Sequence, residues 1–138
     1  MNDVVVNKIQ SIQRGVRRAR EEYRLAGDQF ATDYTRQDAA ILNVTRACEQ
    51  AIDLANYVVR RRKIGVPTTS AEAFDLLTGA DVIPAEMGEN LKRMVGFRNV
   101  AVHQYRDLDI KIVEAVITTG LDDLISFTGA VLRHLSNA

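Results

Sequence analysis

The chain is short of cysteine and proline. It has one cysteine and two prolines among 138 residues, so no disulfide can form within it and few positions interrupt a helix. Cys48 stands at helical spacing from the apolar residues Ile41 and Ile52, which indicates a buried thiol that fills space in a core.

Long apolar runs, internal repeats and low-complexity tracts are also missing. We find no run of about 18 apolar residues and no basic-then-apolar layout at the N-terminus, so we expect a cytoplasmic protein without a membrane span or signal peptide. Apolar residues make up 46% and charged residues 26% of the chain, as in ordinary globular proteins. The length of 138 residues predicts a single domain over residues 1–138.

An excess of charge of either sign is absent as well. The 18 basic and 18 acidic side chains cancel, which argues against a general nucleic-acid coat protein held by bulk positive charge. Arginines nevertheless cluster in two segments: Arg14, Arg17, Arg18, Arg20 and Arg24, and then Arg60–Lys63. Either cluster could be a solvated helix face with cations near a helix end, a phosphate-contacting rim for RNA, or a docking surface for an acidic partner.

Motifs for metals and nucleotide cofactors are not found. No histidine or cysteine pair has metal-ligand spacing, and no glycine-rich phosphate loop occurs. We therefore expect neither a metal nor a cofactor.

Apolar residues recur at steps of three and four along most of the chain, which predicts helices. The expected segments are 3–26; 38–64, with Asp38 as N-cap and Gly65 just beyond the end; a short helix from Ser70 through Leu77; a helix from Pro84 to about residue 103; and 109–136, with an irregularity near 118–120. The predicted fold is all-α, an up-and-down bundle of four principal helices and one short helix.

The octet Arg98–Tyr105, R-N-V-A-V-H-Q-Y, holds the candidate chemistry. A guanidinium can stabilise charge on phosphoryl oxygens, and an imidazole five residues later can transfer protons near neutral pH. On a helical wheel Arg98 points in nearly the same direction as Leu91 and Val102, in the apolar stripe. An ion pair with Glu49 or Asp53 is the structural alternative to a role in a reaction.

The pattern R-N-x-x-x-H-x-Y resembles the signature of the HEPN superfamily and, within it, of the HepT toxins of HepT–MntA toxin–antitoxin pairs. Leu91–Phe97 runs into the motif as the helix of that family does, and Ala51–Asn56, A-I-D-L-A-N, is similar to the family's A-I-D-I-A-N stretch. The resemblance extends over nearly the whole chain.

This resemblance implies a metal-independent endoribonuclease toxin of a type VII system that acts as a homodimer with a composite site. Arg98 would bind and stabilise the scissile phosphate, His103 would be the general base or acid, and Asn99 would orient them. Tyr105 would be the site of inhibitory AMP transfer by an MntA-type nucleotidyltransferase. RNA is the implied substrate, with tRNA plausible from the family. The alternative is a non-catalytic helical module that binds a nucleotide or a partner.

Overall fold

The computed structural model describes residues 2–136, and within them every regular element is helical. The longest helices are α1 (Asp3–Ala26) and α2 (Tyr34–Arg62), joined through the short 3-10 turn η1 (Gly27–Gln29). Next come α3 (Ser70–Gly79) and α4 (Ala85–His103). The 3-10 turn η2 (Tyr105–Asp107) then leads to α5 (Ile110–Ala115), the π-helical segment η3 (Val116–Gly120) and α6 (Leu121–Ser136).

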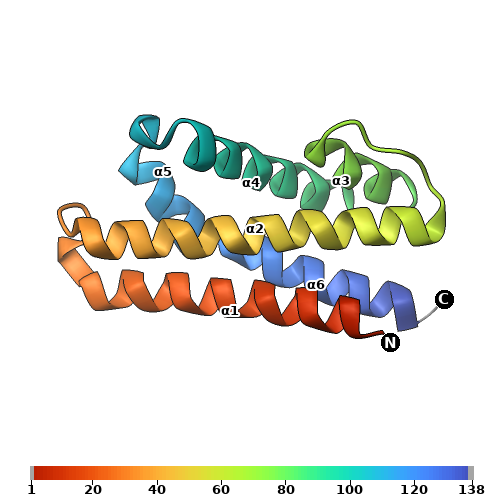
Figure 1. Ribbon diagram of the computed structural model, residues 1–138, viewed down its shortest axis with the longest axis horizontal. Coiled ribbons are helices and arrows are strands. Elements are labelled where there is room, and N and C mark those ends of the chain that lie inside the picture. Colours follow the sequence, from red (N-terminus) through yellow and green to blue (C-terminus); the bar gives the residue numbers. More distant parts are fainter. Residues whose placement is uncertain (1, 137–138) are drawn as a thin grey trace.

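The helices run up and down side by side (Figure 1). Helix α2 lies between α1 on one side and α3 with α4 on the other, and the α5–η3–α6 stretch passes behind it. If that stretch is counted as one interrupted helix, the bundle has four principal helices and the short α3. The predicted all-α up-and-down architecture is confirmed.

Helix α1 has the predicted bounds, but the predicted start of α2 was wrong. The cap of α2 is Asp33, whose carboxylate accepts a hydrogen bond from the backbone N–H of Arg36. Asp38 therefore lies inside the helix. The apolar repeat begins only near Ile41 because the first turn of α2 has no buried residue: Tyr34 and Thr35 are exposed, and Arg36 and Gln37 are half-buried. The hydrophobic pattern could therefore not report the true start.

The remaining helix ends shift by one or two residues from the prediction. Lys63 rather than Gly65 follows the end of α2, in the left-handed conformation (φ 54°, ψ 43°) in which glycine is the usual residue. Thr69 rather than Ser70 caps α3, because the Thr69 hydroxyl accepts from the N–H of Glu72. Pro84 precedes the first turn of α4 as its N-cap residue.

The C-terminal region is irregular where we expected it, at η3. By length and composition, the stretch Ile110–Ser136 is apolar enough to cross a membrane, with mean hydropathy 1.4 over an 18-residue window that is 39% buried. In the bundle its buried side chains include Leu121, Leu124 and Phe127. The core helix of a bundle passes the same test of composition.

The core fills the space between the helices with aliphatic side chains and a few aromatic rings. Phe74 of α3 meets Phe127 of α6 edge to face, with ring centroids 5.4 Å apart. Cys48 is buried, as predicted, and burial raises the pKa of its thiol to about 12, with a further contribution from Glu49. Packing of this kind fixes the register of α4 against α2, which positions the candidate site.

Candidate active site at the end of α4

Arg98 lies where the buried stripe of α4 gives way to solvent. Leu91 is buried whereas Val102, one turn beyond Arg98, is 46% exposed. The Arg98 side chain is 25% exposed, and its Nη2 lies 3.5 Å from Glu49 Oε2 of α2. Its Nη1 donates to Asn99 Oδ1 at 3.1 Å. The Nε atom is buried and has no partner among the described residues, so donor capacity remains on this guanidinium.

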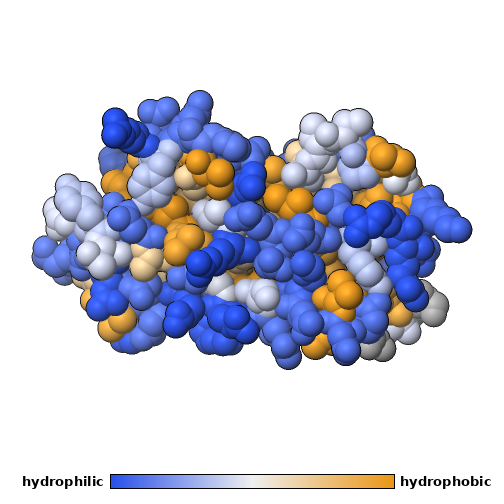
Figure 2. Space-filling model, in the orientation of Figure 1, coloured by the Kyte–Doolittle hydropathy of each residue, from blue (hydrophilic) through white to orange (hydrophobic). Residues whose placement is uncertain are grey.

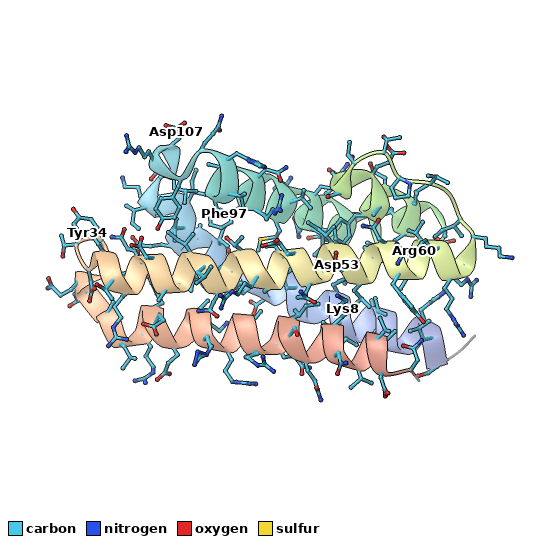
Figure 3. All side chains as sticks on the ribbon, in the orientation of Figure 1. Lys8, Tyr34, Asp53, Arg60, Phe97 and Asp107 are labelled. Carbon is cyan, nitrogen blue, oxygen red and sulfur yellow. The ribbon has the colours of Figure 1, made fainter. Side chains whose placement is uncertain are left out.

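The second acid proposed for Arg98 has a different partner. Asp53 accepts from Lys8 of α1 at 3.3 Å, and the two side chains meet in the seam between α1 and α2 (Figure 3). Of the two acidic residues considered as partners of Arg98, only Glu49 therefore pairs with it. The Glu49 side chain is 44% exposed, so solvent weakens this ion pair.

His103 is the last residue of α4, and its side chain is exposed. The helix ends because Gln104 adopts φ −140° and ψ 47°. Asn99 is also exposed, one turn before His103. Asn99 therefore links the Arg98 guanidinium to the solvent-facing side of α4 that carries the imidazole.

Tyr105 follows on the turn η2, 45% exposed. Its hydroxyl donates a short hydrogen bond to Asp38 Oδ1, across 67 positions of sequence. Partial burial raises the pKa of the Tyr105 phenol to about 12, and the hydrogen bond and negative charge of Asp38 act in the same direction. Sequence reasoning missed Asp38 as a site residue, because no local signal distinguishes this carboxylate from a helix cap.

The second histidine lies far from this site. The pKa of His134 on α6 is lowered by burial and then by the nearby charge of Arg62, at the end of α2. Asp38 and Arg62 stand roughly 36 Å apart along α2 at about 1.5 Å per residue. A protomer therefore brings one histidine, His103, to the candidate site.

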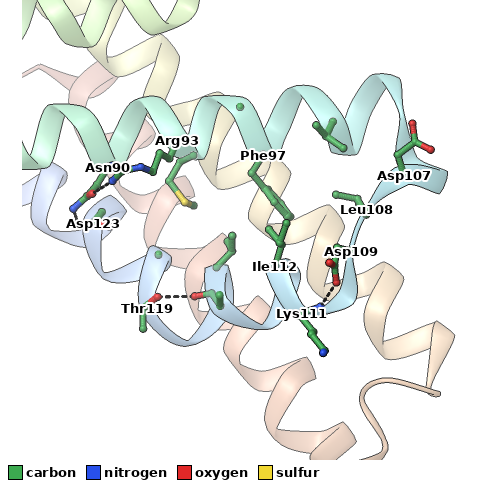
Figure 4. Close-up of a pocket in the computed structure, with 16 residues that line it drawn as sticks. Asn90, Arg93, Phe97, Asp107, Leu108, Asp109, Lys111, Ile112, Thr119 and Asp123 are labelled. Carbon is green, nitrogen blue, oxygen red and sulfur yellow. Dashed lines mark hydrogen bonds between the residues drawn. The ribbon is translucent and has the colours of Figure 1, made fainter.

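A groove of about 680 Å³ opens beside the site, between α4 and the α5–η3–α6 stretch (Figure 4). Phe97 and Ile112 face each other across it, and Arg93, Lys111 and Asp123 lie at its edge. Ile112 is 55% exposed. The lining is mostly apolar, which is typical of a surface that another molecule covers.

Over residues 2–136, no group of three or more histidine, cysteine, aspartate or glutamate side chains is arranged to hold a metal ion. The groups that can act chemically at the end of α4 are thus a guanidinium, an imidazole, a carboxamide and a phenol.

Comparison with known proteins gives matches over nearly the full chain. The family model described as ribonuclease HepT-like matches residues 12–131. The mRNA nuclease HepT of Shewanella oneidensis is 41% identical over 131 residues, which cover 95% of this chain and 98% of that protein.

Solved structures agree with this assignment. The tri-AMPylated HEPN toxin of Shewanella oneidensis, in complex with its MNT antitoxin, superposes with a TM-score of 0.91 at 40% identity, covering 96% of this chain and 99% of that one. YutE, a cytosolic protein of unknown function from Bacillus subtilis, shares the fold at 15% identity, with a TM-score of 0.81 and coverage of 96% and 89%. The extent of these matches shows that the chain belongs to the HepT-like ribonuclease family.

Proposed function

We propose that this protein is the toxin of a toxin–antitoxin pair, a metal-independent endoribonuclease that acts on cytoplasmic RNA as a homodimer and is silenced by AMP transfer to Tyr105. The family and the mRNA nuclease activity named for the Shewanella oneidensis relative support the reaction class. The observation that supports the proposal most is the exposure of Asn99, His103 and Tyr105 along the end of α4 and the turn after it, with Arg98 hydrogen-bonded to Asn99.

The proposed reaction is cleavage by the RNA's own 2′-hydroxyl. The 2′-oxygen attacks the adjacent phosphorus while its proton passes to an imidazole, and the bond to the 5′-oxygen breaks as that oxygen receives a proton. Arg98, whose side chain is 25% exposed, stabilises the charge on the phosphoryl oxygens. Asn99 orients the guanidinium through their hydrogen bond.

One histidine per protomer is a reason to propose a dimer. The two proton transfers need an acceptor and a donor, and a second copy supplies a second His103 across a shared cleft. The apolar groove beside α4 is the surface that we propose the second copy covers. Val100, one turn before His103, lines this groove, so a copy seated there lies next to the imidazole.

Gly96 supports the same surface. It lies in the interior of α4, lines the groove and is exposed, and a Cβ atom built on it would meet nothing within 4 Å. A helix-interior glycine is about 1 kcal/mol less favourable than alanine, and no contact within the protomer requires one here. Close approach of a second chain gives a reason for it. A groove covered by that chain also accounts for the apolar outer side of α5 and η3.

Tyr105 is the proposed point of control. The relative in complex with its MNT antitoxin is a tri-AMPylated toxin, and Tyr105 is an exposed hydroxyl two residues from His103. An AMP group there would place bulk and negative charge where the RNA phosphate has to bind. It would also replace the proton that Tyr105 donates to Asp38.

Incubation of the purified protein with total RNA tests the reaction. Wild type should cleave in the presence of EDTA and leave 2′,3′-cyclic phosphate and 5′-hydroxyl ends, whereas Arg98→Ala and His103→Ala should cleave far more slowly. Equal cleavage by all three proteins would identify a contaminating nuclease. Loss of wild-type cleavage in EDTA, restored by a divalent cation, would refute metal independence.

Coexpression with an MntA-type nucleotidyltransferase tests the control. Intact-mass measurement should show one or more AMP increments on wild type and none on Tyr105→Phe. An unmodified wild-type chain beside a nucleotidyltransferase shown to be active on another acceptor would refute the switch.

A further inference from the structure

A second groove, separate from the end of α4, lies in the seam between α1 and α2. It has a volume of about 550 Å³ and is lined by Ser11, Arg14, Gly15, Arg18, Asn43, Arg46 and Gln50. The three arginines are exposed, and the three neutral polar side chains are half-buried. The lining is thus cationic and rich in hydrogen-bond donors, unlike the apolar groove beside α4.

The seam changes character along its length. At one end Lys8 of α1 is neutralised by Asp53 of α2 (Figure 3). In the groove the corresponding positions of α2 carry Gln50 and Asn43, which have no charge. Arg14, Arg18 and Arg46 consequently make no ion pair with any residue in the range 2–136, whereas Arg20, Arg24 and Arg36 each contact a carboxylate.

Gly15 brings the two sides of the groove together. A Cβ atom at this position would lie 2.8 Å from the backbone oxygen of Asn43 and 3.0 Å from Ala47 Cβ, so only glycine permits this approach of α1 to α2. Arg14 and Arg18 on α1 line the same groove as Arg46 on α2. Like charges that share one groove repel one another, and an anion bound between them relieves this repulsion.

We infer that this groove binds the phosphate backbone of a single-stranded RNA segment that flanks the scissile bond, an inference that rests on the proposed ribonuclease function. Guanidinium groups recognise phosphate through paired N–H donors. Ser11, Asn43 and Gln50 add neutral groups able to bond to phosphate or ribose oxygens. RNA is the favoured ligand because the groove combines three guanidinium groups, unpaired within residues 2–136, with neutral hydrogen-bonding side chains, the groups that contact phosphate and ribose.

The groove is also placed to serve the candidate site. Arg46 lies about one helical turn before Glu49 on α2, and Glu49 is the ion-pair partner of Arg98 on α4. A helix with its side chains is roughly 10 Å across, and an extended strand crosses that distance within a few nucleotides. On the face of the molecule seen in Figure 2, hydrophilic side chains lie over α1 and α2 and apolar patches over the seam between α2 and α4.

Salt-dependent RNA binding tests the inference. The probe is a fluorescein-labelled single-stranded RNA of about 16 nucleotides, bound to protein carrying His103→Ala so that it is not cleaved. The groove variant adds Arg14→Gln, Arg18→Gln and Arg46→Gln. The control adds Arg60→Gln, Arg61→Gln and Arg62→Gln, which removes equal charge at the far end of α2. Circular dichroism verifies that both variants are folded.

The groove variant should bind the RNA about tenfold more weakly than the parent near physiological salt. The slope of log K against log salt should also fall in magnitude by about 2, because each lost phosphate contact removes about 0.7 from it. The control should keep the slope of the parent. In cleavage assays with His103 restored, the groove variant should raise KM and leave kcat unchanged.

Equal losses of RNA affinity in the groove variant and the control would overturn the inference, because they would show that total positive charge, and not this groove, governs binding. Unchanged RNA binding by the groove variant would overturn it as well, and if that variant instead lost affinity for the nucleotidyltransferase, the groove would be a protein-docking surface. Failure of the wild-type protein to cleave any RNA, together with failure of the His103→Ala protein to bind it, would refute the proposed ribonuclease function itself. The two failures are thereby distinguished.

Discussion

The Tyr105 hydroxyl donates a hydrogen bond to the Asp38 carboxylate, and this contact ties the turn after α4 to the beginning of α2. The bond joins the proposed point of AMP transfer to a helix that also holds Arg98 through Glu49. A phenol that donates to a carboxylate resists ionisation, so this contact adds to the effect of burial and raises the pKa of Tyr105.

Removal of Asp38 should lower the pKa of Tyr105 from about 12 toward its ordinary value of 10.0, though not fully, because partial burial is the largest cause of the shift. Ultraviolet titration of Asp38→Ala, with Tyr105→Phe as the reference, measures the change. In wild type a raised folded-state pKa means that the contribution of Tyr105 to stability is complete below pH 10.0 and is lost as pH rises through about 12. An unchanged Tyr105 titration in Asp38→Ala would contradict the contact.

Tyr105→Phe should cleave RNA about as fast as wild type and escape silencing by the nucleotidyltransferase. The substitution removes the hydroxyl, and with it the Asp38 hydrogen bond, but adds neither bulk nor charge beside His103. RNA cleavage before and after incubation with the nucleotidyltransferase and ATP gives the comparison. If Tyr105→Phe were as inactive as the AMP-modified toxin, loss of the hydroxyl, rather than the added group, would explain the silencing.

Arg98→Ala should lower kcat/KM by about 10²–10³-fold, the usual effect of losing one charge-stabilising donor set. Its melting temperature should barely change, because the Arg98–Glu49 pair is partly exposed and 3.5 Å long. Glu49→Gln is the matched control, since it breaks the same pair but keeps the guanidinium, and it should retain activity. Equal loss of activity in both variants would indicate that Arg98 acts through the ion pair.

Gly96→Gln should give a folded monomer without ribonuclease activity. The new side chain has free space in the protomer but would project into the groove that the second copy is proposed to cover. Gly79→Gln is the control, because a Cβ atom at the end of α3 also meets nothing within 4 Å. Analytical ultracentrifugation of both variants distinguishes the outcomes, and a fully dimeric, active Gly96→Gln protein would place the dimer contact elsewhere.

Cys48 should react with a thiol reagent such as DTNB only when the protein unfolds. Its side chain is buried, and burial raises the thiol pKa to about 12, so almost no thiolate exists at neutral pH. The labelling rate in increasing urea should follow the unfolding transition. Rapid labelling of the native protein would show that the packing between α2 and its neighbours opens locally.

Local patterns in the sequence were sufficient to predict the helical bundle, the order of its helices and the octet that holds the candidate chemistry. Spacings of three and four residues and the motif around Arg98 and His103 are local, and they can be read without knowing which helices meet. The same locality explains the error at α2. Asp33 and Asp38 are both residue types that cap helices. The first turn after Asp33 has no buried side chain, so no apolar residue in it marks Asp33 as the cap.

Contacts between side chains that are distant in the sequence could not be predicted from these local patterns and follow from the packing of the helices. Glu49 and Asp53 are one turn apart on α2. Because of how α2 packs against its two neighbours, Glu49 pairs with Arg98 of α4, whereas Asp53 pairs with Lys8 of α1. The pairing of Asp38 with Tyr105 likewise follows from how α2 packs beside the end of α4. These contacts depend on core packing, which fixes helix register through shape rather than through any short-range pattern.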